Sequence, residues 1–250
     1  MKAMIFAAGL GTRLRPLTDS CPKALMPLGN TVMLGYVLRR LIASGVNHAV
    51  VNVHHHPDMI AEYLERNDNF GIHIDISDER DSLLDTGGGL LHARRFLDDD
   101  SDMPIILHNA DIYTDVDLRL MADFHCGSGA LSTLLVAERN SSRKLLFDSV
   151  MRMCGWQNVS TGEIRPTGCD VSRLKGYAFG GVHIVSPAVF PLLERFAPAG
   201  SKFSITDFYI AACAHTDLLG YMPPEVYDWV DIGSPEKLEK ARQLYNDKNS

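Results

Sequence analysis

The residues best suited to chemistry near the start of the chain are two cations beside a glycine-containing turn. An apolar run ends at residues 7–9, where small side chains let a flat ring or a phosphate approach the backbone closely. The turn over residues 10–12 can point N–H groups at an anion. Arg13 and Lys23 add fixed positive charge. We interpret this segment as a loop for a nucleoside triphosphate. Its expected nucleotide-binding residues are Ala7, Ala8, Gly9, Leu10, Gly11, Thr12, Arg13 and Lys23.

Two familiar phosphate-binding motifs do not fit this loop. The third glycine of a G-x-G-x-x-G dinucleotide fingerprint would fall at Leu14, and no Gly-Lys-Ser/Thr follows for a Walker A loop. A nicotinamide-dependent oxidoreductase is disfavoured further because residues 54–56 are histidines where a ribose-binding acid would be expected. From these residues alone, a glycine-rich turn with two solvated cations stays open as an alternative.

Two aspartates far apart in the chain are candidate metal ligands. Asp111 follows an apolar strand expected over residues 104–108, and Asp231 lies on a short apolar strand. Ligands gather outside the carboxyl ends of parallel strands, and Mg²⁺ favours one or two carboxylates together with substrate phosphates. A lone carboxylate on an apolar strand is unfavourable unless it is paired or bound to metal. A turn-forming Asp111 and a hydrogen-bonded Asp231 at a helix entry are the plainer alternatives.

Two further glycine clusters have possible functional roles. Thr86 and three glycines precede an expected helix that ends near residue 96, and they could form a second cradle for an anion or a ring. A flexible lid hinge is the alternative. Gly180 and Gly181 interrupt a strand expected over residues 177–185, which weakens a strand unless something must approach its backbone.

Other polar residues have structural explanations. Consecutive positions on an extended chain point to opposite faces, so we interpret the histidines at 54–56 as a solvated strand end rather than a metal site. We expect Tyr113, Asp115 and Asp117 to cap a helix over residues 118–125. Residues 138–166 are expected to form a solvated hairpin, with Trp156 in the core.

The elements that must position these residues alternate between strand and helix. This order predicts an α/β fold with right-handed crossovers and a mostly parallel sheet. We expect one domain over residues 1–250, with a nucleotide-binding part at 1–137 and a second part with a C-terminal helix at 138–250. The remaining strands are expected at 3–7, 48–53, 72–76 and 130–137. The remaining helices are expected at 34–42, 57–66, 186–196 and 235–245, and one more helix is expected to begin at residue 206. A frayed tail is expected at 246–250.

Composition excludes several classes of partner. The 250 residues are 46% hydrophobic, which is enough for a sizeable core, and the net charge of −7 without a basic block argues against nucleic acid or an anionic membrane as partner. Five cysteines without C-x-x-C spacing indicate a reduced, cytoplasmic protein. We expect no signal peptide, because the apolar run at 4–8 leads directly into the loop, and no apolar run reaches the ~18 residues of a membrane span.

The extended pattern resembles the signature of sugar-1-phosphate nucleotidyltransferases. The matching string is Gly9-x-Gly11-Thr12-Arg13-Leu14-x-Pro16-Leu17-Thr18, followed by Pro22-Lys23-x-Leu25-x-Pro27. It continues in Thr-Gly-Gly-Gly at 86–89, Asn-x-Asp at 109–111 and Trp-x-Asp-x-Gly at 229–233. Within the family, the chain looks most like short uridylyltransferases acting on N-acetylmuramate 1-phosphate, followed by mannose-1-phosphate guanylyltransferases.

The resemblance implies a Rossmann-like, GT-A-like fold with a mostly parallel, mixed central sheet flanked by helices. It also implies Mg²⁺ as cofactor, and an NTP (UTP or GTP) and a sugar 1-phosphate as the two substrates. The sugar phosphate is then expected to bind to the part at 138–250. The Glu-Lys pair that other members use for the sugar has no clear equivalent here. A sugar contact from Arg139, Arg143, Lys144, Phe147 or Asp148 is an alternative to the solvated hairpin, which is the preferred interpretation. The implied roles are catalysis by Arg13, Lys23 and Asp111, metal binding by Asp111 and Asp231, nucleotide contacts from Thr86, Gly87, Gly88 and Asn109, and sugar contacts from Asn109, Gly180 and Gly181.

The implied reaction transfers a nucleotidyl group from the NTP to the sugar 1-phosphate and releases pyrophosphate. UTP with N-acetylmuramate 1-phosphate is the leading pair, and GTP with mannose 1-phosphate is the alternative. A non-catalytic nucleotide-sugar sensor is the rival from another class. Such a sensor would be expected to have lost Arg13, Lys23, Asp111 or Asp231, and all four are present.

Overall fold

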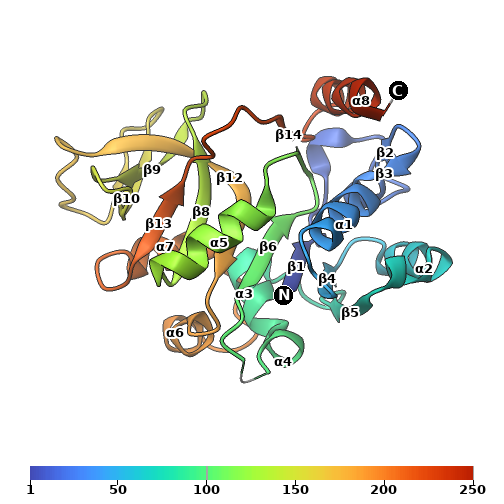
Figure 1. Cartoon of the computed structure of the whole chain (residues 1–250), viewed down its shortest axis with the longest axis horizontal. Helices are drawn as coiled ribbons and strands as arrows, with labels where there is room; N and C mark the ends of the chain where they lie inside the picture. Colours follow the sequence, from blue (N-terminus) through green and yellow to red (C-terminus); the bar gives the residue numbers. More distant parts are fainter. Residues whose placement is uncertain (100, 250) are drawn as a thin grey trace.

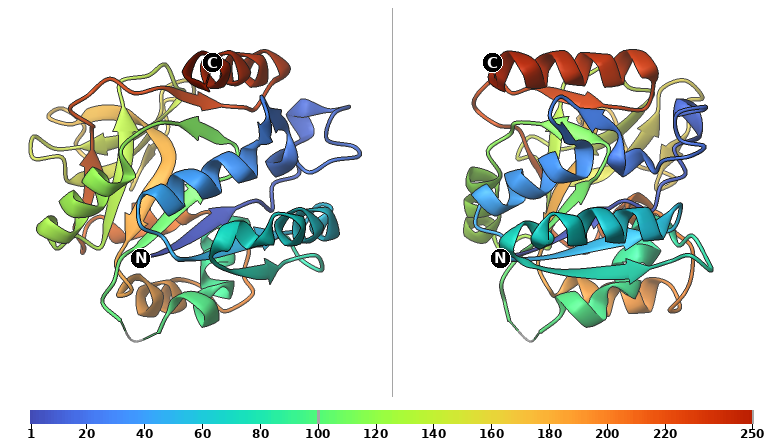
Figure 2. Two further views of the ribbon diagram at one scale, coloured as in Figure 1. Left: turned by 45° about the vertical axis from the view of Figure 1, so that its right-hand side comes forward. Right: turned by 90° about the vertical axis from the view of Figure 1, so that its right-hand side faces the viewer.

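A ten-stranded mixed sheet crosses the molecule and carries helices on both faces (Figures 1 and 2). The computed structural model describes residues 1–99 and 101–249. The strands of the large sheet are β1 (Lys2–Phe6), β4 (His48–Val53), β5 (His73–Asp78), β6 (Ile105–Asn109), β8 (Ser132–Ala137), β9 (Arg143–Phe147), β10 (Met153–Asn158), β11 (Ile164–Arg165), β12 (Lys175–Val185) and β13 (Leu218–Tyr221).

Two small sheets and the helices complete the described residues. The small sheets pair β2 (Pro27–Leu28) with β3 (Thr31–Val32) and β7 (Ile112–Thr114) with β14 (Trp229–Asp231). The α-helices are α1 (Met33–Ala43), α2 (Pro57–Arg66), α3 (Asp85–His92), α4 (Arg94–Leu97), α5 (Leu118–Ser128), α6 (Val189–Phe196), α7 (Ile205–Ala212) and α8 (Pro235–Asn249). Short 3₁₀ turns are η1 (Thr12–Leu14), η2 (Lys23–Leu25) and η3 (Asp68–Gly71).

The sheet changes character along its length. Its order is β11-β10-β9-β12-β6-β1-β4-β5, with β8 beside β12 and β13 beside β8. Strands β6, β1, β4 and β5 pair in parallel, whereas β12 runs antiparallel to β6, β8 and β9. The expected α/β fold with a mixed central sheet and flanking helices is confirmed.

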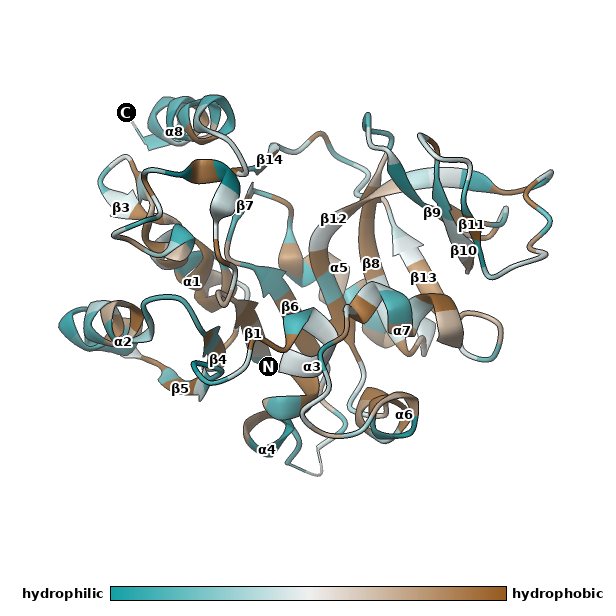
Figure 3. Cartoon of the chain, turned by 180° about the vertical axis from the view of Figure 1, so that it is seen from behind, coloured by the Kyte–Doolittle hydropathy of each residue, from teal (hydrophilic) through white to brown (hydrophobic). Residues whose placement is uncertain are grey.

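The central parallel strands β6, β1 and β4 are buried on both faces, as strands covered by crossover helices must be, whereas the edge strand β5 is partly exposed. In β1, Ala3 and Ile5 pack into a core that includes residues of α1, α2 and α5, while Met4 packs into a second core with α3, α6 and α7. This alternation follows the two-residue period of a strand. Figure 3 shows the result, with hydrophobic strands in the centre and the outer helix α2 mainly hydrophilic.

The C-terminal helix is longer than expected. Helix α8 extends through Asn249, so the expected frayed tail at 246–249 is wrong; Ser250 lies outside the described residues. The helix is mostly hydrophilic, yet Tyr245 donates to Asn30, and Lys248 forms ion pairs with Asp115 and Asp228. These contacts fix α8 beside β2 and β14 (Figure 1).

Several local expectations need correction. Asp117 caps α5 by accepting the N–H groups of Arg119 and Leu120, but Tyr113 is buried on β7 and Asp115 pairs with Lys248. Helix α6 begins at Val189, after the expected start at residue 186. The hairpin β9–β10 is confirmed, and Trp156 is half-buried: it packs against the second core and also borders a cavity. Within residues 1–99 and 101–249, no helix is both long and apolar enough to span a bilayer.

Candidate active site

Four charged side chains meet beyond the carboxyl ends of β1 and β6. The ammonium of Lys23 forms an ion pair with Asp111 Oδ2 and lies 3.6 Å from Asp231 Oδ1. The guanidinium of Arg13 lies 3.8 Å from Asp231 Oδ2. Only 11% of the Lys23 side chain is exposed, whereas 70% of the Arg13 side chain is, so Arg13 is accessible to a ligand.

Strand pairing brings the two aspartates together. Asp111 lies in the turn between β6 and β7, and β14 pairs with β7 in a register that sets Asp231 opposite Ile112. The N–H of Ile232 donates to the carbonyl of Asp111 at 3.0 Å. The small β7–β14 sheet therefore joins a carboxylate from the middle of the chain to one near its end.

The two cations are held by short turns. Pro22 accepts the N–H of Leu25 and starts the turn η2, which places Lys23 above the buried Ala24 and Leu25. Arg13 lies against the backbone of Gly233, where an added Cβ would come within 2.8 Å of the guanidinium. Glycine at 233 therefore makes room for the arginine.

The loop after β1 is shaped by glycine. Gly11 has φ of +62°, and an added Cβ would lie 2.8 Å from the methyl group of Thr18, whose hydroxyl donates to the Gly11 carbonyl. At Gly9, by contrast, an added Cβ would meet nothing within 4 Å, so this backbone faces open space. The N–H of Ala7 donates to Asn52 Oδ1 at 2.8 Å and is not free for a phosphate.

Three cavities converge on Asp111. The first, of about 310 Å³, lies against Ala7, Ala8, Gly9 and Thr86. The second, of about 190 Å³, is formed mainly by Gly9, Gly11, Thr12 and Arg13. The third, of about 710 Å³, opens toward β9, β10 and β12. Lys23 borders the first two cavities, and Asn109 borders the first and third. Among the expected nucleotide residues, the exposed Leu10 borders none of the three.

We expected the glycines after Thr86 to precede a helix, but they lie within α3. An added Cβ at Gly87 would lie 2.3 Å from the Phe203 ring, and one at Gly88 would lie 2.2 Å from the carbonyl oxygen of Ser201. The N–H groups of Gly87 and Gly88 both donate to the Phe203 carbonyl, so they are not free to cradle an anion. The structure brings Thr86 to the first cavity, but Gly87 and Gly88 face the chain before α7.

A buried polar network explains the third glycine of this run. Asn52 donates to Glu79 Oε1 at 2.7 Å, and the N–H of Leu84 donates to Glu79 Oε2 at 3.0 Å. An added Cβ at Gly89 would lie 2.7 Å from Glu79 Oε1. Burial raises the pKa of the Glu79 carboxyl, and the hydrogen bonds from Asn52 and Leu84 oppose that shift. The network joins the first cavity to β4 and α3.

The two glycines of β12 have different surroundings. Gly181 has φ of +70° at an irregularity in the strand, and an added Cβ would lie 2.9 Å from the amide nitrogen of Asn109. It borders the third cavity. Gly180 instead packs on Leu135, and its carbonyl accepts the indole N–H of Trp229. Neighbouring side chains do approach the backbone at both Gly180 and Gly181, but only Gly181 borders the third cavity, where the sugar is expected.

The side chains around the third cavity were mostly missed from sequence. Arg165 lies over the Trp156 ring at 5.2 Å and reaches Glu163 and Asp207, while Arg143 forms no ion pair within the described residues. No motif marks these positions, since they come from separate strands and from α7. Asn52, Asp85 and Lys202 at the first cavity were missed for the same reason.

Asp111 and Asp231 fit a divalent cation. Their carboxylate oxygens are of the type that Mg²⁺ prefers. Asp231 Oδ1 is buried and has no hydrogen-bond partner within the described part of the chain; the Lys23 ammonium, 3.6 Å away, compensates its charge without a hydrogen bond, which leaves the oxygen available to a metal ion. The histidines at 54–56 face three different backbone carbonyls, those of Glu79, Thr18 and Asp19.

Comparison with known proteins establishes the family. The family model described as "Nucleotidyl transferase" matches residues 2–248. The chain belongs to the nucleotidyl transferase family. This confirms an enzyme of the nucleotidyltransferase class and rejects the nicotinamide-dependent oxidoreductase.

Two curated relatives of this transferase have different substrates. It is 30% identical over 244 residues to N-acetylmuramate alpha-1-phosphate uridylyltransferase of Caulobacter vibrioides, covering 94% of this chain and 92% of the relative. It is 31% identical over 246 residues to mannose-1-phosphate guanylyltransferase catalytic subunit beta of Xenopus tropicalis, covering 98% of this chain and 64% of the relative. The transferase thus spans less than two thirds of the guanylyltransferase.

Solved structures share the fold. A crystal structure assigned as a glucose-1-phosphate thymidylyltransferase of Bacillus anthracis aligns with a TM-score of 0.81 at 19% identity, covering 99% of this chain and 96% of that one. A UDP-glucose pyrophosphorylase complexed with UDP-glucose aligns with a TM-score of 0.77 at 18% identity, covering 99% and 98%. At these identities the likeness establishes the fold alone.

Proposed function

We propose that this transferase moves a uridylyl group from UTP to N-acetylmuramate 1-phosphate and releases pyrophosphate. The observation that carries the proposal is the convergence of three cavities on Asp111, beside Lys23 and Arg13. The first cavity suits a base and ribose, the second the triphosphate, and the third the sugar. In this proposal, residues 1–137 chiefly hold the nucleotide and residues 138–250 chiefly hold the sugar phosphate.

The chemistry needs positioning and charge rather than a general base. The sugar phosphate is already an anion, and one of its oxygens attacks the α-phosphorus in line. A new P–O bond forms as the bond to the β-phosphate oxygen breaks, and that electron pair leaves with pyrophosphate. The barrier comes from the approach of anions and from the charge that develops on the phosphoryl and leaving oxygens.

Each charged residue has a role in this proposal. Lys23, held between the carboxylates, stabilises the reacting phosphates, and the exposed Arg13 binds the leaving β- and γ-phosphates. Asn109, between the first and third cavities, orients both substrates. Asp111 and Asp231 hold Mg²⁺, which when bound supplies a divalent charge next to the two phosphates.

The third cavity favours the muramate substrate over mannose. N-acetylmuramate carries a lactyl carboxylate that mannose lacks. Arg143 borders the cavity and forms no ion pair within the described residues, so its guanidinium can pair with that carboxylate.

Pyrophosphate release tests the proposal. Four NTPs are each mixed with several sugar 1-phosphates and Mg²⁺, and kcat/KM is measured for every pair. We expect the highest value for UTP with N-acetylmuramate 1-phosphate. A higher value for GTP with mannose 1-phosphate would favour the alternative pair. No pyrophosphate from any pair, with nucleotide sugar still bound, would favour a sensor.

A further inference from the structure

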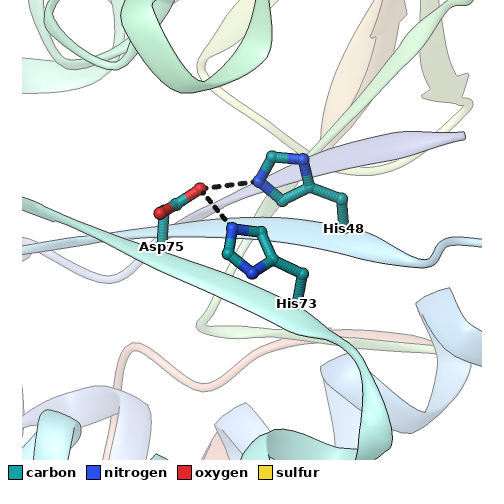
Figure 4. A group of neighbouring side chains, drawn as sticks. All are labelled: His48, His73 and Asp75. Atoms are coloured by element: carbon teal, nitrogen blue, oxygen red, sulfur yellow. Dashed lines mark hydrogen bonds and ion pairs between the residues drawn. The ribbon is translucent and has the colours of Figure 1, made fainter.

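Three potential metal ligands lie near the amino ends of β4 and β5, whereas the active site lies beyond the carboxyl ends of the parallel strands. His48 begins β4 and His73 begins β5, and the parallel register sets them opposite each other. Asp75 follows two residues later on β5 and therefore shares a face with His73. Figure 4 shows the two imidazoles turned toward one carboxylate oxygen.

The geometry is close to that of a metal site. The Nε2 atoms of His48 and His73 lie 2.7 and 3.1 Å from the same oxygen, Asp75 Oδ2. The ligand atoms of the three residues all lie within 4.8 Å of one another. Ligands on a tetrahedral zinc ion are about 3.3 Å apart, from Zn–N and Zn–O bonds of about 2.0–2.1 Å. Small side-chain shifts, with the proton of each neutral imidazole on Nδ1 so that Nε2 offers its lone pair, would make room for an ion.

The surroundings favour an open site on a rigid support. The two strands are hydrogen-bonded in register along their length, which holds the ligands in place. The His48 and Asp75 side chains are 19% and 24% exposed, whereas His73 is 67% exposed. A bound ion would therefore have three protein ligands and a side open to water.

The ligand set selects the kind of ion. Two imidazoles with one carboxylate suit Zn²⁺ and related transition metals, whereas Mg²⁺ prefers oxygen ligands such as those of Asp111 and Asp231. Strand β4 has six residues, which separates its two ends by about 17 Å. An ion at His48 is thus distant from the reacting phosphates and joins the edge strand β5 to β4.

We propose that His48, His73 and Asp75 form a transition-metal site that binds one Zn²⁺ per chain and stabilises the β4–β5 edge. This site is independent of the active site. Mg²⁺ does not occupy it, and loss of the catalytic carboxylate does not empty it.

Calorimetric titration of the metal-free full chain with Zn²⁺ tests the proposal. We expect one micromolar site, and about tenfold or weaker binding in His73→Ala and in Asp75→Asn, since each removes one ligand. His73 is mostly exposed, so its variant should fold, and equal thermal unfolding in a chelator checks this. Co²⁺ in place of Zn²⁺ should give an intense visible absorption that Asp75→Asn removes.

Two control variants test whether Zn²⁺ binds at His48, His73 and Asp75 rather than elsewhere on the chain. His55→Ala removes another partly exposed histidine, which faces the Thr18 carbonyl, and should leave Zn²⁺ affinity unchanged. Asp111→Asn should also leave it unchanged and should not alter the rise in Tm that Zn²⁺ produces. Wild-type affinity in both His73→Ala and Asp75→Asn, or loss of binding in His55→Ala, would overturn the proposal.

Discussion

The first and third cavities are built in contrasting ways. The first has small residues at the end of a parallel strand along one side, Ala7, Ala8 and Gly9, with polar side chains such as Asn52 and Lys202 around them. The third is lined by long polar and aromatic side chains from antiparallel strands, including Arg143, Trp156 and Arg165. Backbone-rich surfaces suit the parts common to all NTPs, whereas distinctive side chains suit a particular sugar. The difference suggests that the parallel half, with the first cavity, determines the reaction class, and that the antiparallel half, with the third cavity, determines which sugar phosphate is accepted.

The largest effect should follow a change where the two cavities meet. Asp111→Asn removes one charge at the centre and should lower kcat about 10²–10³-fold, because a contact of this kind acts chiefly in the transition state. Steady-state rates at saturating Mg²⁺ measure this, and thermal unfolding should show an intact fold. Asp98→Asn is a matched control, since Asp98 is also a partly buried, ion-paired aspartate and lies away from the cavities. A near wild-type rate in Asp111→Asn would remove that residue from the mechanism.

The antiparallel half should respond to acid. His125, on α5, lies at hydrogen-bond distance from Thr133 on β8 and from Ser186 just after β12, and burial lowers its pKa to about 4. The folded state then binds fewer protons than the unfolded state, whose histidine pKa is about 6.5. Its contribution is fully present above pH 6.5 and is lost as the pH falls toward 4.

Urea unfolding at pH 7 and pH 5 measures this contribution. Since each pH unit is worth about 1.4 kcal/mol, His125 should account for about 2 kcal/mol of the loss between these values. His125→Gln should reduce the loss by that amount, while the buried His108 and His183, whose pKa values are lowered to about 4 and 3, account for a further part. An unchanged loss in His125→Gln would exclude His125 as a source.

A change confined to the third cavity should separate the substrates. Arg143→Ala should raise KM for N-acetylmuramate 1-phosphate about tenfold, the worth of one charge-assisted hydrogen bond. KM for UTP and activity with mannose 1-phosphate should stay near wild type. Arg152→Ala is the matched control, because Arg152 pairs with Asp217 and does not border the cavity. Equal loss with both sugars would break the contrast between the two cavities.

The smallest effect should follow a substitution in α3, the helix that brings Thr86 to the first cavity. Gly87→Ala should lower the free energy of unfolding by about 1–2 kcal/mol, because its Cβ would overlap the Phe203 ring. Gly127→Ala in α5 meets nothing within 4 Å and should be neutral or stabilising by up to about 1 kcal/mol. Denaturant unfolding of both variants checks this, and stabilisation by Gly87→Ala would contradict the close packing of α3.

The same contrast explains what the sequence could predict. Strand β4 and helix α2 were predicted with their observed bounds, because their apolar spacing and flanking residues are local signals. The turn around Gly11 was predicted for the same reason, because the glycines next to an apolar strand are a local signal. The glycines of α3 were misplaced because they are required by the distant Phe203, Ser201 and Glu79 rather than by a local turn. The side chains that β9, β10 and α7 bring to the third cavity have no motif of their own, because strand pairing brings them together.

The central claim is that Asp111 and Asp231 hold a divalent ion beside the α-phosphate, with the base in the first cavity. Anomalous diffraction from crystals containing Mn²⁺ and an unreactive UTP analogue tests it most directly. We expect a peak bonded to both carboxylates, with the analogue's triphosphate next to Arg13 and Lys23. A nucleotide bound in the first two cavities with no Mn²⁺ at either aspartate, or a nucleotide bound elsewhere, would contradict the account.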